Sequence, residues 1–165
     1  MRMKTEAPQA AVRFDPDWRS VLESSALEVF EMMAGARMGL NSKTDAEPSG
    51  ELTAMVGMAG ALCGIMTVRC SRETATKCAS LMLGGDAVSN PSTVRDALGE
   101  LCNMVAGNFK AKVANLADTC MLSVPTVISG EDYSMDAAEP TERVTVGLLF
   151  EGEPVWVTLV AHARS

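Results

Sequence analysis

A carboxylate and a side-chain amide, Glu100 and Asn103, lie three residues apart in the stretch RDALGELCNMVAGNFKAKV, residues 95–113. Residues three apart on a helix share a face, so these two side chains would project side by side. A carboxylate pairs with cations, and an amide both donates and accepts hydrogen bonds. Such a pair could meet a polar partner, although a polar stripe on a helix is also typical of an ordinary solvated face.

Two glycines within this helix favour a docking surface over a merely solvated face. Each interior glycine costs about 1 kcal/mol relative to alanine, and solvation gives no reason to bear that cost twice. Gly107 lies on the polar stripe and Gly99 lies beside it, where a missing Cβ would let another backbone approach closely. The polar stripe consists of Asp96, Glu100, Asn103, Gly107 and Lys110. We therefore expect a partner to dock on it.

Other kinds of chemistry have weaker signals. His162, the single histidine, has no Ser or Cys placed as a nucleophile beside it, and we expect it at an ordinary surface or edge position. Gly84 and Gly85 are not followed by the G-K-[ST] of a phosphate-binding loop. The five cysteines are odd in number and lack C-x-x-C spacing; they are Cys63, Cys70, Cys78, Cys102 and Cys120. Buried thiols in a reducing cytoplasm are the favoured interpretation, with a redox or metal role as the alternative. We expect no metal site.

Composition indicates one globular domain with acidic character. Of the 165 residues, 47% are hydrophobic, which is enough for a single sizeable core. We expect residues 1–14 to form a flexible N-terminal segment and residues 15–165 a single domain. The formal net charge is −7 and there is no run of Lys or Arg, so nucleic acid is an unfavourable partner and a basic protein surface a better one.

Neither a leader peptide nor a membrane span is expected. The first 14 residues lack an apolar segment followed by a cleavage site. Residues 54–68 are uncharged, but this stretch is shorter than the roughly 20 residues that a spanning helix needs, and glycines divide it. We interpret it as two buried strands around a turn, and we expect a cytoplasmic protein without a membrane partner.

Hydrophobic periodicity and capping residues predict the elements. Helices are expected from Pro16, capped by Asp15, to about Met38; over residues 72–83; and from near Pro91 to about Leu116. Strands are expected over residues 52–58, 62–69 and 119–128, followed by an acidic loop through Pro140 and a terminal hairpin over residues 142–163. Residues 39–50 read as a loop. The order α-β-β-α-α-β-β-β predicts a two-layer α+β fold with helices packed on a mainly antiparallel sheet.

The long third helix should bury the face opposite its polar stripe. Apolar residues recur there at steps of three and four: Val94, Leu98, Leu101, Val105, Phe109, Val113 and Leu116. This stripe is expected to pack on the sheet. The terminal hairpin, in contrast, is apolar at successive positions, which predicts coverage on both of its faces.

The stretch LGELCNMVAGNFK, residues 98–110, resembles the signature of the CheC/CheX/FliY family of bacterial chemotaxis phosphatases. That signature is an acidic or Ser residue before Glu-x-x-Asn, then a proline about two dozen residues later. The counterparts here are Asp96, Glu100, Asn103 and Pro125, although Pro125 follows Asn103 one residue sooner than expected. The match is best for CheX, whose helix carries a similar N-M-[IV]-A-G-N run, and the resemblance covers about residues 15–162.

CheC-like members carry a second Glu-x-x-Asn on the first helix. The first helix here, with VLESSALEVFEMM at residues 21–33, also resembles the family's, but Glu23 is followed by Ala26 where the amide should be. We therefore expect one active site.

The resemblance implies a substrate, a fold and roles. The substrate would be a CheY-type receiver domain that is phosphorylated on an aspartate and already holds Mg²⁺, so no cofactor is expected in this chain. Asn103 would orient an in-line water, and Glu100 would pair with a receiver lysine. Partner binding would involve Asp96, Gly99, Gly107, Lys110 and Pro125. The fold would be CheC-like, and two copies would form a homodimer through their sheets. The alternative is a non-catalytic dimeric adaptor that binds a phosphorylated receiver without hydrolysing it.

Overall fold

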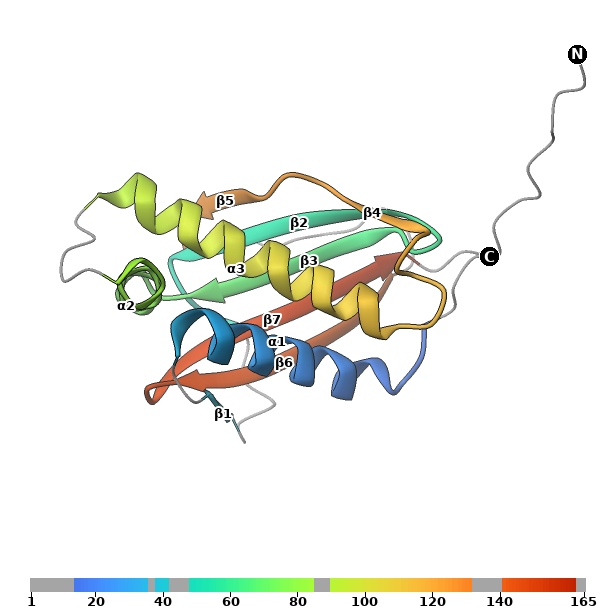
Figure 1. Ribbon diagram of the computed structural model, residues 1–165, viewed down its shortest axis with the longest axis horizontal. Helices are drawn as coiled ribbons and strands as arrows, with labels where there is room; N and C mark the ends of the chain where they lie inside the picture. Colours follow the sequence, from blue (N-terminus) through green and yellow to red (C-terminus); the bar gives the residue numbers. More distant parts are fainter. Residues whose placement is uncertain (1–13, 36–37, 42–47, 85–89, 132–140, 163–165) are drawn as a thin grey trace, which may run out of the picture.

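Three helices cover one face of a seven-stranded antiparallel sheet (Figure 1). The computed structural model describes residues 14–35, 38–41, 48–84, 90–131 and 141–162. The two-layer α+β architecture predicted from the sequence is confirmed. The predicted N-terminal segment, apart from Phe14, and most of the predicted acidic loop lie outside the described residues.

The helices are α1 (Trp18–Ala34), α2 (Arg72–Leu83) and α3 (Pro91–Lys112). The strands are β1 (Met38–Leu40), β2 (Leu52–Gly60), β3 (Gly64–Cys70), β4 (Cys120–Leu122), β5 (Thr126–Ser129), β6 (Thr141–Phe150) and β7 (Glu153–His162). The sheet order is β1-β6-β7-β3-β2-β4, and β5 also pairs with β2. The chain thus has two more strands than the predicted order, one before β2 and one from a divided strand.

Helix α1 is shorter than predicted at both ends. It begins at Trp18, with Asp17 rather than Asp15 at the N-cap, and it ends at Ala34 rather than near Met38. Gly35 adopts a left-handed conformation, φ 62°, and its N–H donates to the Glu31 carbonyl, which closes the helix. Met38 instead starts β1, opposite Phe150. Sequence periodicity missed β1, because a three-residue strand is too short to show alternation.

Local capping explains the other two helices. In α2, which spans the predicted residues, the Thr74 N–H donates to the Ser71 hydroxyl, 3.1 Å away. In α3, the Ser92 N–H donates to the Asn90 side chain, and Pro91 occupies the first turn. The predicted end of α3 at Leu116 is wrong, because Val113 leaves the helical conformation at φ −86°, ψ 126°.

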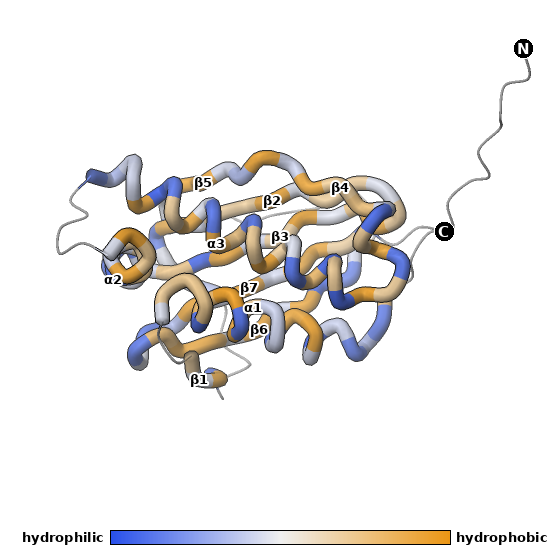
Figure 2. Tube along the Cα trace, in the orientation of Figure 1, coloured by the Kyte–Doolittle hydropathy of each residue, from blue (hydrophilic) through white to orange (hydrophobic). Residues whose placement is uncertain are grey.

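The apolar stripe of α3 packs on the sheet as predicted. Its members within the helix are all buried: Val94, Leu98, Leu101, Val105 and Phe109. Phe109 also receives the edge of Trp18 from α1, with ring centroids 5.6 Å apart. Figure 2 shows apolar and polar residues alternating along α3 turn by turn. The polar stripe is therefore held on a helix whose other side is fixed in the core.

The predicted strand over residues 119–128 is divided by a β-bulge. Both β4 and β5 pair with β2, in the registers Met58↔Leu122 and Met55↔Thr126. From the first pair to the second, β2 moves three residues and its partner moves four, so one extra residue must be accommodated between Leu122 and Thr126. Pro125 lies in this bulge, where its missing N–H leaves no ladder position unfilled.

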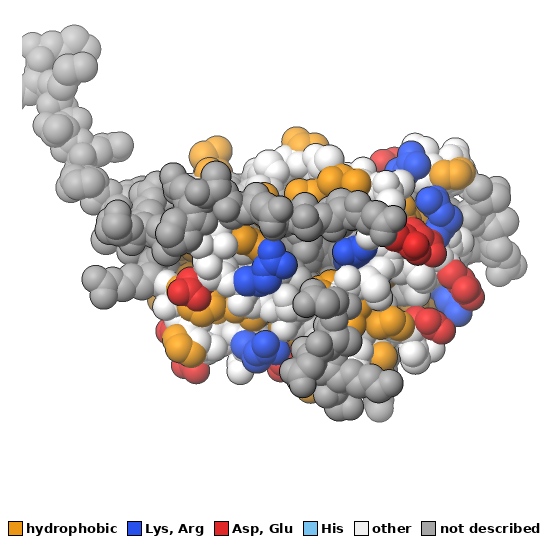
Figure 3. Space-filling model, turned by 180° about the vertical axis from the view of Figure 1, so that it is seen from behind, with side chains coloured by type: hydrophobic (Ala, Val, Ile, Leu, Met, Phe, Trp, Pro, Cys, Tyr) orange, Lys and Arg blue, Asp and Glu red, His pale blue; other side chains and the backbone are white. Residues whose placement is uncertain are grey.

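The terminal hairpin is covered on both faces in only one of its two strands. β7 sits between β6 and β3, and every residue from Val155 to Ala161 is buried, as predicted. β6 differs from the prediction at its start, where Glu142 and Arg143 are exposed. β1 pairs with Leu148–Phe150, the last three residues of β6. Seen from the side away from the helices, apolar, basic and acidic side chains are interspersed (Figure 3).

Candidate active site

Glu100 and Asn103 lie one turn apart on the outward side of α3. The Glu100 side chain is exposed and Asn103 is half-buried, while their helical neighbours Leu101 and Cys102 are buried in the core. The side chains of Glu100 and Asn103 make no hydrogen bond or ion pair with any residue that the structure describes. Both side chains are thus positioned by the fold and remain available to a partner.

Gly99 allows the bulge to pack against this turn of α3. A Cβ at Gly99 would lie 3.2 Å from the Pro125 Cβ and 3.6 Å from the Val127 Cγ2. The glycine is buried beneath these side chains, so its missing Cβ serves a contact within the chain. The structure therefore brings two of the predicted site residues, Gly99 and Pro125, together beside Glu100.

A shallow hollow separates α3 from the bulge. Arg95, Asp96 and Glu100 line it from the helix, and Val124, Pro125 and Val127 line it from the opposite side, with Gly99 between them. Asp96 and Glu100, four residues apart on one helix, are like charges that weakly repel each other. The helix wall of the hollow therefore carries two carboxylates and the guanidinium of Arg95, and the opposite wall is apolar.

Gly107 differs from Gly99 in its surroundings. No described atom lies within 4 Å of the position that its Cβ would occupy. Gly107 is one turn beyond Asn103 and is half-buried. No packing within the described chain accounts for this glycine.

Lys110 belongs to the polar stripe, but its side chain is hydrogen-bonded to a strand of the sheet. Its ammonium donates to the carbonyl of Cys120, with Nζ 2.6 Å from the oxygen. The contact ties the start of β4 to the last turns of α3. A partner-binding role for Lys110 stays a prediction.

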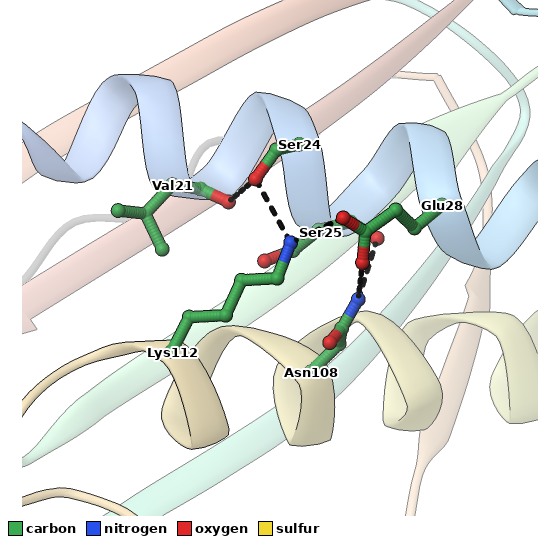
Figure 4. Close-up of polar contacts among 6 residues, drawn as sticks. All are labelled: Val21, Ser24, Ser25, Glu28, Asn108 and Lys112. Atoms are coloured by element: carbon green, nitrogen blue, oxygen red, sulfur yellow. Dashed lines mark hydrogen bonds and ion pairs between the residues drawn. The ribbon is translucent and has the colours of Figure 1, made fainter.

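On its other side, α3 contributes Asn108 and Lys112 to a second carboxylate–amide cluster, whose carboxylate is Glu28 of α1 (Figure 4). The Lys112 ammonium lies 2.7 Å from a Glu28 oxygen, and the Asn108 amide donates to the other oxygen over 3.0 Å. The Lys112 and Asn108 contacts lower the pKa of the Glu28 carboxyl below its usual value. This cluster joins α1 to α3.

Helix α1 presents no second site at the expected positions. The side chain of Ala26, where CheC-like members carry an amide, is fully buried in the core. An amide there would face the core rather than a partner.

Most of the thiols are core residues, as favoured from the sequence. Cys70, Cys78, Cys102 and Cys120 are buried and Cys63 is half-buried. Burial raises the pKa of the Cys78 thiol to about 12 and that of Cys102 to about 12. Among the described residues, no group of three or more His, Cys, Asp or Glu is arranged to hold a metal ion. His162 is half-buried at the end of β7.

A profile of the family described as "Chemotaxis phosphatase CheX" matches residues 52–149, which include the polar stripe of α3 and the bulge. The chain belongs to the CheX family. A curated relative, "CheY-P phosphatase CheX" from Thermotoga maritima, is 35% identical over 85 residues. That match covers 51% of this chain and 55% of the relative, so the chain spans only about half the relative's length.

Solved structures show the same fold over most of the chain. CheX from Vibrio vulnificus has a TM-score of 0.76 at 20% identity, covering 92% of this chain and 100% of the other. The CheX protein in a CheX-CheY-BeF3-Mg²⁺ complex from Borrelia burgdorferi has a TM-score of 0.70 at 21% identity, with 90% and 100% covered. Within the described part of this CheX-family protein, no helix is long and apolar enough to cross a membrane.

Sequence reasoning did not single out Arg95, Ser123 or Val124, which the structure places at or beside the hollow. Ser123 holds the bulge: the Gly57 N–H donates to its hydroxyl over 2.8 Å, and its own N–H donates to the Gly57 carbonyl over 2.9 Å. The available signal was Ser-Val-Pro itself, because a residue before proline is held extended. An apolar residue next to a motif proline could have been flagged as part of the site.

Proposed function

We infer that this chain is a phosphatase that removes the phosphoryl group from the aspartate of a CheY-type receiver domain. The observation that carries this function is the pair Glu100 and Asn103, which lie one turn apart on α3 with no side-chain partner among the described residues, and of which Glu100 lines the hollow. Support comes from membership of the CheX family and from a relative named for CheY-P dephosphorylation. One structure of similar fold is a CheX-CheY complex.

Asn103 orients the attacking water in this proposal. Its amide carbonyl accepts a hydrogen bond from the water, and its NH₂ donates without placing a negative charge near the phosphoryl group. The water oxygen forms a bond to phosphorus as the bond from phosphorus to the aspartate oxygen breaks, which yields inorganic phosphate and a free carboxylate. Positioning supplies the catalysis, and Mg²⁺ belongs to the receiver.

Glu100 anchors the partner. An isolated carboxylate beside a phosphoryl group would repel it, so Glu100 needs a cation from the receiver, and a lysine that also contacts the phosphoryl group would satisfy both. Because Glu100 has no cation from the described residues of its own chain, that place is open to the partner.

Gly107 fits a docking role on the same face. The open space above it would admit a receiver backbone to the helix surface one turn from Asn103. Together with Asp96 and Glu100, it extends the proposed contact along about three turns of α3.

We also propose a homodimer through the sheets, as the family resemblance implies, with the polar stripe facing outward. The apolar strand β7 cannot supply the contact through a free edge, because it is interior to the sheet. The outer side of β6 is a better candidate, since β1 pairs with only its last three residues. Light scattering should report a dimer at micromolar concentration, and a monomer would contradict the assembly.

The experiment measures phosphate release from purified phosphorylated receivers with and without this protein. Release should accelerate for at least one receiver, in the presence of Mg²⁺, and a double variant Glu100→Ala/Asn103→Ala should give no acceleration. Circular dichroism and thermal melting establish that the double variant folds. A chain that binds a phosphorylated receiver but never accelerates release would be the adaptor, and the phosphatase function would be wrong.

A further inference from the structure

The β-bulge between β4 and β5 contains Val124 and Pro125, which form part of the apolar wall of the hollow. Between the pairs Met58↔Leu122 and Met55↔Thr126, the extra residue forces the chain away from β2. Val124 lies in this segment and is 84% exposed. A bulge of this kind commonly redirects a side chain next to a functional site.

This wall is held firmly despite its exposure. Ser123 exchanges two hydrogen bonds with Gly57, of 2.8 and 2.9 Å, on one side of Val124. On the other side, Pro125 packs over the missing Cβ of Gly99. Val124 is therefore presented to solvent by fixed neighbours, so burying it against a partner would cost little conformational entropy.

The opposite wall supplies a complementary charge. The carboxylates of Asp96 and Glu100 have no hydrogen-bond or ion-pair partner among the described residues. Arg95, the cation at the rim, directs a guanidinium nitrogen toward Ser129 Oγ, 3.4 Å away. A side chain that fits both walls needs a positive end and an apolar body, and lysine has both in its ammonium and four-carbon stem.

We propose that Val124, supported by Pro125, packs against the aliphatic stem of the receiver lysine whose ammonium pairs with Glu100. This inference rests on the proposed function, because it extends the docking surface that begins at Glu100 and Asn103. Packing the stem also excludes water from the ion pair, which strengthens that contact. Val124 is thus a binding residue for the receiver and takes no part in the chemical step.

The test compares Val124→Thr with Met121→Thr. Threonine keeps the shape of valine and replaces one methyl group with a hydroxyl. Met121 is a control on β4, because it is 77% exposed and does not line the hollow. Affinity is measured for a receiver loaded with beryllofluoride and Mg²⁺. Val124→Thr should weaken binding by about fourfold or more, with an unchanged single-turnover rate at saturation, and Met121→Thr should bind like the parent.

Two receiver variants identify the group that Val124 contacts. Replacing the receiver lysine by methionine keeps an apolar stem, so Val124→Thr should still weaken binding by a similar factor. Replacing that lysine by alanine removes the stem, and Val124→Thr should then have no further effect. An equal loss with the alanine receiver would overturn the inference, because Val124 would be contacting another group.

The outcomes separate this inference from the function on which it rests. If the parent protein binds and dephosphorylates the receiver while Val124→Thr binds equally well, the role of Val124 is wrong and the phosphatase stands. If the parent binds no receiver and releases no phosphate, the function and this inference are both overturned.

Discussion

Two carboxylate–amide pairs lie on opposite sides of α3, and among the described residues only one of them has a cation as a partner. Glu28 and Asn108 share a cluster with Lys112, whose ammonium lies 2.7 Å from the Glu28 carboxylate (Figure 4). Glu100 and Asn103 have the same side-chain chemistry, but no described residue supplies them with a cation. The first pair fastens α1 to α3, whereas the second leaves the place of the lysine open.

The difference shows that residue type alone does not mark a site. Both glutamates are exposed, and both amides are half-buried on the same helix. What distinguishes Glu100 and Asn103 is that no described residue makes a hydrogen bond or ion pair with their side chains, and that Glu100 lines a hollow. A carboxylate that lacks its cation is the one from which a partner can gain binding energy.

Removing the two glutamates should give the largest contrast. Glu100→Ala should weaken binding to a beryllofluoride-loaded receiver by about 2 to 5 kcal/mol, because the receiver lysine would lose its partner in a desolvated contact. Glu28→Ala should leave that affinity unchanged. Isothermal titration calorimetry measures both. Equal losses in the two variants would remove the distinction between the pairs.

The second-largest contrast should be between alanine variants of the two asparagines, and it should appear in the rate of dephosphorylation. Asn103→Ala should slow single-turnover dephosphorylation by about 100-fold or more, since a misplaced water no longer attacks in line, while affinity barely changes. Asn108→Ala should retain the parental rate and lose about 1 kcal/mol of unfolding free energy with its hydrogen bonds. Rapid-quench kinetics with urea unfolding distinguish the two. A parental rate in Asn103→Ala would contradict its role.

Gly107→Ala should have opposite effects on folding and on docking. Because the Cβ meets no described atom, alanine should raise the free energy of unfolding by up to about 1 kcal/mol. Receiver affinity should fall, because the added methyl group obstructs the approaching backbone. Gly99→Ala is the comparison variant and should gain less stability than Gly107→Ala, since its Cβ would lie 3.2 Å from the Pro125 Cβ and this close contact offsets the gain in helix propensity. Unchanged affinity in Gly107→Ala would show that this surface stays outside the interface.

The smallest expected effect is the change with pH in the stability that Glu28, in its cluster with Asn108 and Lys112, gives to the fold. The pKa of Glu28 is lowered by Lys112 and then Asn108, so the carboxylate stabilises the fold above its ordinary value of 4.5 and loses this contribution as pH falls through the lowered pKa. Parent and Glu28→Gln should therefore differ in urea unfolding at neutral pH and converge in strong acid. A difference that grows toward acid would contradict the sign.

The helices and the central strands were predictable because their signals are local. Ser71 and Gly84 bound α2 as expected, and the apolar stripe of α3 is buried. Glu100 and Asn103 share a face because helix geometry requires it. Features that depend on pairing between distant residues were missed, namely β1, which forms only opposite Phe150, and the bulge, which needs the register against β2.

The candidate site was predictable in its helix but not in its second wall. The motif and the glycines identified α3 as the site helix, but the sequence suggested the same role for Gly99 and Gly107, namely the close approach of a partner's backbone. The structure separates them, because Gly99 meets Pro125 and Gly107 meets no described atom. Val124 carries no chemical signal in the sequence. Its position follows from its neighbours, because Ser123 contacts Gly57 and Pro125 packs over Gly99, and both glycines are far from it along the chain.

The bulge also controls how this side of the sheet meets other chains. A regular edge strand offers an unbroken row of N–H and C=O groups to which a foreign strand can add. Here the edge consists of two short strands, and Pro125 between them offers no N–H at all. Strand addition is therefore discouraged next to Glu100. A protein that binds at this edge would have to be recognised through contacts between side chains. This is consistent with the proposal that a homodimer would form through the other side of the sheet, along the part of β6 that β1 does not pair with.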